Sequence, residues 1–466
     1  MISLIKDTIF YSSSKVLAGL LNLLIIMMFT RFLNQEDYGY YLIFISYTFF
    51  ISSLFYWAQR ISVNRYLNDY MGNYNSFIKT NIALFFKITI VIICLNILIF
   101  LSFVDLKFKI LIYLCSLAAF LKSFFDLNQA ILNMNFKSFL FSFNIILRSL
   151  FFISISFLLF YFFNLKSESL IFGFLVSYFL VLCTSSLSIF KKYFNYSYDK
   201  KIEKKIISFS VPLVGLFFCD YILTFSDRIF IHYYLGTENV GIYGANYDLI
   251  KQLSLFFMIV QGYIMYPRIN KAYSNKDRIK FNTLFNYNIK LFLITFIPLC
   301  FFIIYFNNFI SNIFLGKAFR YADFPIIPLF SIMFFMWGIK IHHFDYIFQL
   351  KEKTKFSFYI LFLGSIINIV LNIFLIPIFG LMGALYSTFL AYLFILVFSI
   401  ILSRQFIEIN FPYLLFIKVI FNLFICFIIL EQISHLVNPI MSIIILFFLY
   451  LLNLFLFNKK DLLIKL

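Results

Sequence analysis

Six basic side chains of this sequence fall inside long apolar stretches, where a charge needs a specific reason to be present. They are Lys15, Lys122, Arg148, Arg228, Lys251 and Lys340. Ammonium and guanidinium groups bind phosphate through charge-assisted hydrogen bonds, which strengthen where water is scarce. These residues therefore predict a binding site for an anionic substrate, with no covalent chemistry required.

Arg148 stands out among these cations because it has no acidic neighbour within one helical turn. Its partner must come from another helix or from the substrate, and Asp126 and Asp220 are the obvious acids for the first case. Lys15 is supported by a polar stripe on its helical face, formed by Ser12, Gly19 and Asn22. Snorkelling of Lys15 to a membrane surface is the alternative.

Acidic residues accompany two of the cations at helical spacing. Lys122 and Asp126 are four residues apart, and Lys251 lies three residues after Asp248. Residues three or four apart lie on one face of a helix, so each set can form a local ion pair or can line a cavity. The sequence leaves both readings open.

A third acidic group lies where Asp220, Thr224 and Asp227 repeat at helical spacing, with Arg228 adjacent. One reading is ion coupling, in which a carboxylate exchanges a proton or a sodium ion. The other is a structural clasp between Asp227 and Arg228 at the helix end, which we favour for that pair. The ion-coupling candidates are therefore Asp220, Asp227, Asp126 and Asp248.

Other chemistry finds little support. No G-x-x-x-x-G-K-[ST] motif is present, which excludes direct ATP drive within this chain. The six cysteines lie far apart inside apolar stretches, without metal-ligand spacing. We therefore expect no catalytic residues, no metal and no cofactor. A membrane glycan polymerase or acyltransferase is the enzymatic alternative, but such an enzyme would be expected to carry a large external loop, and the loops predicted here are short.

The stretches that carry these residues have the length and composition of membrane spans. Hydrophobic residues make up 63% of the chain and charged residues 12%, against about 25% charged in soluble proteins. A helix crosses the hydrocarbon core with roughly 20 residues, and this rule predicts an all-α membrane protein of about fourteen transmembrane helices. The spans lie near residues 9–31, 39–58, 78–101, 108–127, 139–163, 168–190, 206–232, 240–265, 287–306, 325–348, 356–376, 380–402, 412–431 and 438–457.

Loop charge sets the predicted orientation. The formal net charge is +18, and the lysines and arginines cluster in alternate loops between the spans. Such loops are cytoplasmic under the positive-inside rule, which places both termini in the cytoplasm. The basic charge is thereby explained without a nucleic-acid partner.

An internal repeat divides the chain into halves. Residues 33–41 follow the first predicted span and residues 235–243 follow the seventh, and both fit L-[NG]-x-E-[DN]-x-G-x-Y. The copies share orientation, which predicts a parallel repeat around an axis along the membrane normal and a central cavity between the halves. The predicted domains are an N-terminal six-helix lobe (1–190), a basic cytoplasmic connector (191–205), a C-terminal six-helix lobe (206–403) and two additional transmembrane helices (404–466).

Short motifs follow one another through the second half. They are Phe209-Ser210-Val211-Pro212, Asp227-Arg228, Leu235-Gly236, Val240-Gly241-Ile242-Tyr243, Asn368-Ile369-Val370-Leu371-Asn372, Ile376-Pro377, Phe379-Gly380 and Gly383-Ala384. In order and spacing, these motifs resemble the polysaccharide-export flippases of the multidrug/oligosaccharidyl-lipid/polysaccharide exporter superfamily. With the basic connector and the two extra C-terminal spans, the resemblance covers essentially the whole chain.

The resemblance implies a flippase of the O-antigen or capsule type in the bacterial cytoplasmic (inner) membrane. Such a protein moves an undecaprenyl-(pyro)phosphate-linked oligosaccharide from the cytoplasmic to the outer leaflet by alternating access, with a proton or sodium ion as the candidate coupling ion. Its partners would be the lipid-linked oligosaccharide, the bilayer, and a glycan polymerase with assembly proteins. A cation-coupled multidrug or small-molecule antiporter of the same superfamily is the alternative, which should concentrate acids in its cavity.

Overall fold

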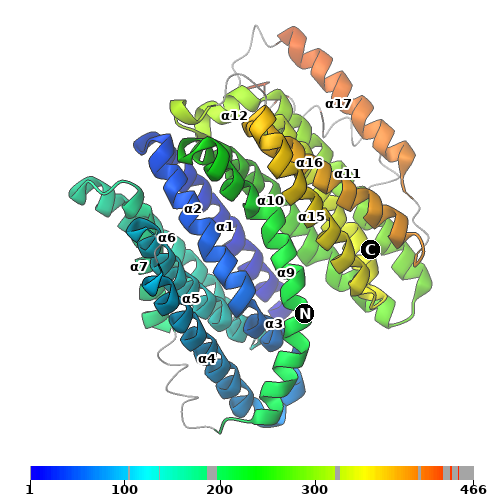
Figure 1. The fold of residues 1–466 in the computed structure, drawn as a ribbon. Coiled ribbons are helices and arrows are strands. Elements are labelled where there is room, and N and C mark those ends of the chain that lie inside the picture. The colour runs from blue at the N-terminus through cyan, green and yellow to red at the C-terminus, as the bar shows by residue number, and fades with distance from the viewer. Residues whose placement is uncertain are drawn as a thin grey trace. The chain divides into compact units, whose positions relative to one another are not determined.

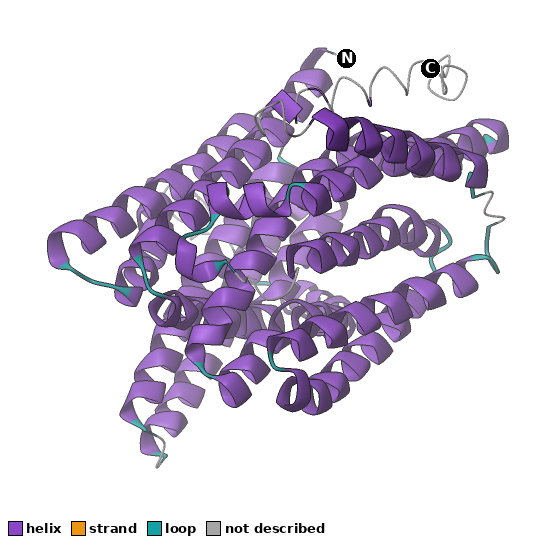
Figure 2. Cartoon of the chain, turned by 90° about the horizontal axis from the view of Figure 1, so that it is seen from above, coloured by secondary structure: helices purple, strands orange, loops and turns teal. Residues whose placement is uncertain are grey.

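The structure is a computed structural model that describes residues 2–102, 105–135, 137–185, 197–320, 326–407, 411–433, 441–442, 445 and 450. Over these residues the chain is helical, with short connecting loops and no strand (Figure 2). The predicted all-α fold class is therefore confirmed.

The first part of the chain forms a series of long helices, one of which is interrupted. The elements are α1 (Ile2–Phe32), α2 (Gln35–Ile51), the π-helical turn η1 (Ser52–Tyr56), α3 (Trp57–Tyr66), η2 (Asn68–Asn73), α4 (Tyr74–Leu101), α5 (Leu106–Met134), α6 (Ser138–Phe163) and α7 (Ser167–Ser185).

The second part continues in the same manner and contains a second π-helical turn, η4. The elements are α9 (Lys200–Leu235), α10 (Thr237–Ser274), α11 (Arg278–Tyr305), α12 (Asn307–Phe314), η3 (Lys317–Phe319), α13 (Ile326–Ile339), η4 (Lys340–Phe344), α14 (Asp345–Leu350), α15 (Thr354–Phe379), α16 (Leu381–Ser403) and α17 (Tyr413–Ile433).

The helices agree with the predicted spans. Each predicted span before the last coincides with a long helix or with a run of helices that continue one another, and residues 438–457 lie mostly outside the described residues. Within the described residues, 11 helices are long and apolar enough to cross a membrane, or up to 12 if a bent pair within α9 is counted as one span. The total of about fourteen stays a prediction.

The helices expose apolar side chains as expected for a lipid solvent. In the second half of α4, Ile90, Ile97 and Leu98 are 60%, 54% and 64% exposed. Inside the fold, by contrast, the serine, threonine and asparagine side chains of many helices are buried. A helix on the surface of a water-soluble protein would instead carry polar residues on its exposed face.

The chain folds into two compact units. Unit 1 contains Met1–Asp248, Leu315–Arg320 and Leu361–Ala391, and unit 2 contains Leu249–Phe314, Tyr321–Ile360 and Tyr392–Leu466. In unit 1, α6 packs against α1 and α7, and α2 packs against α5 and α9 (Figure 1). In unit 2, α11 packs against α13 and α17. The lobes at 1–190 and 206–403 stay a prediction, because unit 1 combines segments from both.

Candidate functional site

Arg228 of α9 is held in unit 1 by an acid from the next helix. Its Nη2 atom lies 2.6 Å from Oδ1 of Asp248 in α10, and its side chain is only 1% exposed. The rings of Phe225 and Tyr247 lie beside the guanidinium, with centroids 5.3 and 5.7 Å from Cζ. A buried guanidinium with a charge-assisted bond and aromatic neighbours is a fixed structural element, because its charge is already compensated.

The predicted clasp between Asp227 and Arg228 is therefore wrong. Adjacent residues of a helix point about 100° apart and do not face each other, so the two side chains meet different neighbours. Arg228 pairs with Asp248, which lies one helix further along the chain. Asp248, which the sequence placed within reach of Lys251, thus forms an ion pair with Arg228.

Asp227 lies at the centre of a separate polar cluster in unit 1. The side chain is 2% exposed. Its Oδ2 atom accepts hydrogen bonds from the hydroxyls of Tyr243 and Thr388, both at 2.5 Å. Its Oδ1 atom accepts from the amides of Asn372 at 2.8 Å and Asn368 at 3.3 Å. Four neutral donors from α10, α15 and α16 therefore surround the carboxylate, and within the described residues no cation forms an ion pair with it.

A second layer of hydrogen bonds orients these donors. The hydroxyl of Ser226 donates to Oδ1 of Asn368 at 3.0 Å, and the hydroxyl of Ser387 donates to Oδ1 of Asn372. Asn368 also donates to Thr388 Oγ1 at 3.1 Å. Because each amide oxygen already has a donor, the amide nitrogens are directed at Asp227.

The turn between α15 and α16 brings the halves of this cluster together. Gly380 has a φ of 60°, a left-handed conformation that costs glycine little. A Cβ atom at Gly383 would overlap the backbone oxygen of Leu375, so the two helices approach closely after the turn. This tight hairpin sets Asn372 opposite Ser387. The glycines of the motifs Phe379-Gly380 and Gly383-Ala384 are thus explained by the tight turn and by the close approach of the two helices.

Sequence reasoning missed Tyr243, Thr388 and the two asparagines as site residues, although it used Asn368 and Asn372 as family motifs. A signal was present, since the two amides are four residues apart in an apolar helix. Polar side chains inside a membrane span are costly and tend to face polar neighbours. Which acid they face could not be read from the sequence, because α9 and α15 are distant in the chain.

Two further cations from the sequence prediction are paired with acids. Lys122 Nζ lies 2.7 Å from Oδ2 of Asp126, as the spacing allowed, and 4.6 Å from the ring centroid of Phe49. In unit 2, Lys340 Nζ lies 2.8 Å from Oδ2 of Asp345. Both pairs are largely buried. The basic character predicted for the interior is thus reduced, because Lys122, Arg228 and Lys340 each have their own acid.

Arg148 differs from these residues. It is half-buried in α6 of unit 1. Its Nη2 atom donates to Oγ of Ser149 at 2.8 Å, and Cζ lies 5.3 Å from the ring centroid of Tyr178 in α7. Within the described residues, neither Asp126 nor any other acid forms an ion pair with Arg148. Its charge is therefore not neutralised by an acid of the described part of the chain.

The remaining predicted residues are half-buried. Lys15 lies in α1 and Asp220 in α9, both in unit 1, and Lys251 lies in α10 within unit 2. Each interacts with neighbouring groups in the fold. The backbone oxygen of Asp220 accepts a hydrogen bond from the hydroxyl of Thr224 at 2.8 Å.

The two copies of the repeat contact each other reciprocally in unit 1. A Cβ atom at Gly39 would overlap the backbone oxygen of Thr237, and a Cβ atom at Gly241 would overlap that of Gln35. Gly39 corresponds to Gly241 in the repeat, and Gln35 corresponds to Thr237. The same contact is therefore made twice with the roles exchanged, as a two-fold axis between the copies requires.

The segment Leu315–Arg320 packs against this contact. The amide of Gly316 donates to Thr30 Oγ1 at 3.0 Å, and the ring of Phe319 lies 5.5 Å from the ring of Tyr38. Asn246 donates to the backbone oxygen of Phe319 at 3.0 Å. Leu315 and Phe319 are fully buried, so this end of unit 1 is closed by tightly packed backbone and aromatic rings.

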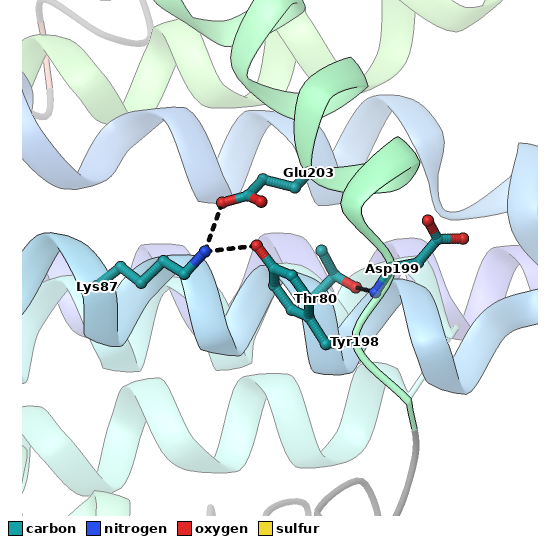
Figure 3. Close-up of polar contacts among 5 residues, drawn as sticks. All are labelled: Thr80, Lys87, Tyr198, Asp199 and Glu203. Atoms are coloured by element: carbon teal, nitrogen blue, oxygen red, sulfur yellow. Dashed lines mark hydrogen bonds and ion pairs between the residues drawn. The ribbon is translucent and has the colours of Figure 1, made fainter.

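At the opposite end of α9, a polar latch joins its start to α4 (Figure 3). Lys87 Nζ donates to Tyr198 Oη at 2.5 Å and to Glu203 Oε1 at 2.8 Å, and the amide of Asp199 donates to Thr80 Oγ1 at 3.2 Å. Burial and the hydrogen bond with Glu203 raise the pKa of Tyr198 above its ordinary value.

Two protein families match parts of this chain. The family described as "Polysaccharide biosynthesis protein" matches residues 4–273, and the family described as "MatE" matches residues 212–374. No curated protein matches the chain at a significant level.

Solved structures share the fold. A lipid II flippase, MurJ, in an inward closed conformation aligns with a TM-score of 0.74 and 17% identity, covering 98% of this chain and 99% of that one. An inward-facing multidrug resistance transporter of the MATE family aligns with a TM-score of 0.62 and 12% identity over 86% of this chain and 94% of that one. A MOP superfamily transporter from Pyrococcus furiosus aligns with a TM-score of 0.57 and 13% identity over 86% and 95%.

Proposed function

Because this chain belongs to the polysaccharide biosynthesis protein family, whose model matches residues 4–273, we propose that it flips an undecaprenyl-(pyro)phosphate-linked oligosaccharide from the cytoplasmic to the outer leaflet. The family predicted from the sequence motifs is confirmed by this match, and the chain is a multi-pass membrane transport protein. The identity of the cargo, its lipid carrier and the O-antigen or capsule pathway belong to the proposal.

The proposal rests on the surroundings of Arg148, a half-buried cation without an acidic partner among the described residues. A guanidinium near the middle of a span costs at least about 2.5 to 3.5 kcal/mol on insertion scales. Ser149 and Tyr178 compensate part of that cost, but no acid among the described residues neutralises the charge. A phosphate group would supply the missing charge and accept two parallel hydrogen bonds from the guanidinium. The lipid phosphate of the cargo is such a group.

Alternating access requires a closure that can open, and the repeat contact provides one. Loop charge assigns the end with Gly39, Gly241 and Leu315–Arg320 to the outside. In this structure that end is closed by close backbone packing within unit 1. We infer that this contact is the outer gate and that release of the cargo separates the two copies of the repeat.

The cluster around Asp227 is our candidate for ion coupling. A buried carboxylate with only neutral donors keeps an uncompensated charge, so binding a proton or a small cation there is favourable. The surrounding oxygens of Thr388, Asn368 and Asn372 suit sodium after the amides rotate, since alkali and alkaline-earth cations prefer oxygen ligands. Asp126 and Asp248 are weaker candidates because each already forms an ion pair.

The multidrug antiporter remains the second candidate, and the match of residues 212–374 to the MatE family is the observation that favours it. The two functions differ in the charge of the cargo. An antiporter for cationic drugs gains nothing from an unpaired arginine, whereas a flippase for a lipid phosphate does.

The direct test is transport by the purified protein in proteoliposomes. We expect an undecaprenyl-pyrophosphate-linked saccharide to become accessible to a membrane-impermeant glycan-modifying enzyme, and a cationic dye not to be transported. Transport of the dye without the lipid would overturn the flippase proposal in favour of the antiporter. Asp227→Asn should remove the dependence of flipping on pH or on sodium, whichever is found, while Asp126→Asn should keep it.

Orientation can be tested in intact cells. In a Cys94→Ser background, a cysteine at Tyr233, which is 80% exposed beside the repeat, should react with an impermeant maleimide. A cysteine at Lys353 should not. The reverse pattern would invert the orientation and the inferred direction of transport.

A further inference from the structure

Unit 2 contains a cavity, and none of the residues discussed for transport or ion coupling lines it. Its volume is about 990 Å³, which is within the range of small-ligand pockets. It lies between the end of α10, the first turns of α11, the turn after α14 and the segment after α16. The residues that bear on its chemistry are Lys276, Arg278, Lys351, Tyr273, Phe281 and Phe406.

The charge of this cavity is predominantly positive. Lys276, Arg278 and Lys351 line it, with Asp277 as the one acid among the described lining residues. Asp277 is already engaged, because its Oδ1 atom accepts the backbone amide of Lys280 at 3.0 Å and caps α11. Within the part of the chain that the structure describes, Lys276 and Arg278 form no ion pair, and Lys351 only faces the ring of Tyr273, with Nζ 5.6 Å from its centroid. The three cations therefore remain available.

Aromatic rings form the walls beneath these cations. The ring centroids of Tyr273 and Phe281 are 5.5 Å apart, as are those of Phe281 and Phe285. On the other wall, Phe406 lies 5.3 Å from Phe356. A ligand that fits both kinds of surface has an anionic group and an adjoining apolar part.

One exposed apolar residue indicates that this cavity lies near the membrane surface. Ile279, between Arg278 and Lys280 in the first turn of α11, is 82% exposed. A branched apolar side chain in that position is stabilised if it enters the boundary between headgroups and acyl chains, while neighbouring cations stay with the headgroups. The first turn of α11 thus has the pattern of a segment that lies at the lipid surface.

We propose that this cavity binds the phosphate headgroup of an anionic phospholipid, with Lys276, Arg278 and Lys351 on the phosphate and the aromatic walls against the start of the acyl chains. The surrounding segments carry further exposed cations that attract an anionic leaflet, at Lys271, Lys280, Lys353, Lys355 and Arg404. A soluble phosphate would satisfy the cations but would leave the aromatic walls and Ile279 unused. The inference is independent of the cargo, because it involves none of the residues of the proposed transport pathway.

Titration of the full-length protein in detergent with fluorescent phosphatidylglycerol tests this site. We expect Lys276→Gln/Arg278→Gln/Lys351→Gln to weaken binding by about tenfold or more, because hydrogen bonds between charged groups are lost. The matched control, Lys271→Gln/Lys353→Gln/Lys355→Gln, removes the same charge outside the cavity and should change the affinity by less than about twofold. Phosphatidylcholine should bind neither variant tightly.

Four results would overturn the proposal. Equal weakening in both triple variants would show that the attraction is diffuse. Competition by glycerol phosphate at the same concentration as phosphatidylglycerol would indicate a pocket for soluble anions, and preferential binding of undecaprenyl phosphate would indicate a substrate site. If the cavity variant fails to fold, a photoreactive anionic lipid can be bound to the unmodified protein instead. It should cross-link to the peptide that contains Tyr273 and Phe281. Cross-linking confined to other peptides would be the fourth result that overturns the proposal.

Discussion

Arg148 and Arg228 are both arginines inside membrane helices of unit 1, yet their surroundings differ. Arg228 is 1% exposed, is bonded to Asp248 at 2.6 Å and is flanked by two aromatic rings. Arg148 is half-buried and is bonded to a serine hydroxyl beside one ring. The first is paired with a carboxylate through Nη2, although its buried Nε and Nη1 atoms have no hydrogen-bond partner among the described residues. The second has no acid among the described residues.

This difference distinguishes a structural arginine, which is part of the framework of helix-to-helix contacts, from an arginine that can bind a ligand. A buried pair that is complete holds helices together and has no charge left for a ligand, because its desolvation is already offset. A cation left without an acid destabilises the empty protein and becomes favourable when an anion arrives. The sequence presents both arginines as candidate cavity cations, and only the contacts distinguish them.

The largest effect is expected from breaking the framework pair. Arg228→Met leaves the carboxylate of Asp248, whose side chain is 27% exposed, without its cation, which should cost up to about 3 kcal/mol and reduce the amount of folded protein. Arg228→Met/Asp248→Leu removes both charges and should recover most of it. Thermal unfolding of the purified variants measures this effect. A double variant as unstable as the single one would show that Arg228 has a role other than pairing.

A change at Arg148 should have the opposite signature. Arg148→Met should leave the protein level unchanged and the melting temperature equal to or above that of the unmodified protein, because an uncompensated charge is removed. Loss of a charged hydrogen bond of about 1.5 to 3 kcal/mol corresponds to a decrease in flipping of roughly 10- to 150-fold. Arg148→Lys should lose most activity as well, since an ammonium cannot form the two parallel bonds. The readout is complementation of a flippase-deficient strain, with immunoblots as control.

The repeat contact extends the framework to the proposed outer gate. Gly39→Ala and Gly241→Ala each place a methyl group against a backbone oxygen, which should cost about 1 to 3 kcal/mol through overpacking. The two effects should be similar because the contact is reciprocal. Gly72→Ala is the control, as nothing lies within 4 Å of its would-be Cβ atom. A strong effect at only one of the two glycines would contradict the two-fold relationship.

The smallest effect is expected at the latch of Lys87, Tyr198 and Glu203. Lys87 is 54% exposed in its side chain, and exposed ion pairs contribute little because water and salt screen them. Lys87→Met should therefore leave the melting temperature nearly unchanged, in contrast to Arg228→Met. A large decrease would mean that the latch belongs to the framework.

The sequence predicted the parts of the structure that depend on local composition. The apolar stretches located the helices, and the i, i+4 spacing of Lys122 and Asp126 allowed the pair that is observed. The repeat also marked two segments that prove to be in contact. These features follow from hydropathy and helical periodicity.

Contacts between distant segments could not be predicted in this way. The partner of Arg228 lies on the next helix, and spacing along one helix favoured its neighbour Asp227 instead. The donors around Asp227 come from α10, α15 and α16, so they meet only after folding. Asp345, which neutralises Lys340 across the π-helical turn η4, was missed because that turn changes the helical register.

The role of Arg148 in holding the lipid phosphate is tested most directly by the binding of an undecaprenyl-pyrophosphate-linked saccharide to purified protein, compared between Arg148→Lys and Arg228→Met/Asp248→Leu. We predict that Arg148→Lys, with a melting temperature equal to that of the unmodified protein, loses at least about tenfold in affinity, whereas the folded double variant keeps nearly full affinity. Unchanged affinity in Arg148→Lys and in Arg148→Met, with affinity lost in the double variant, would contradict it, because Arg228 would then be the residue that holds the phosphate.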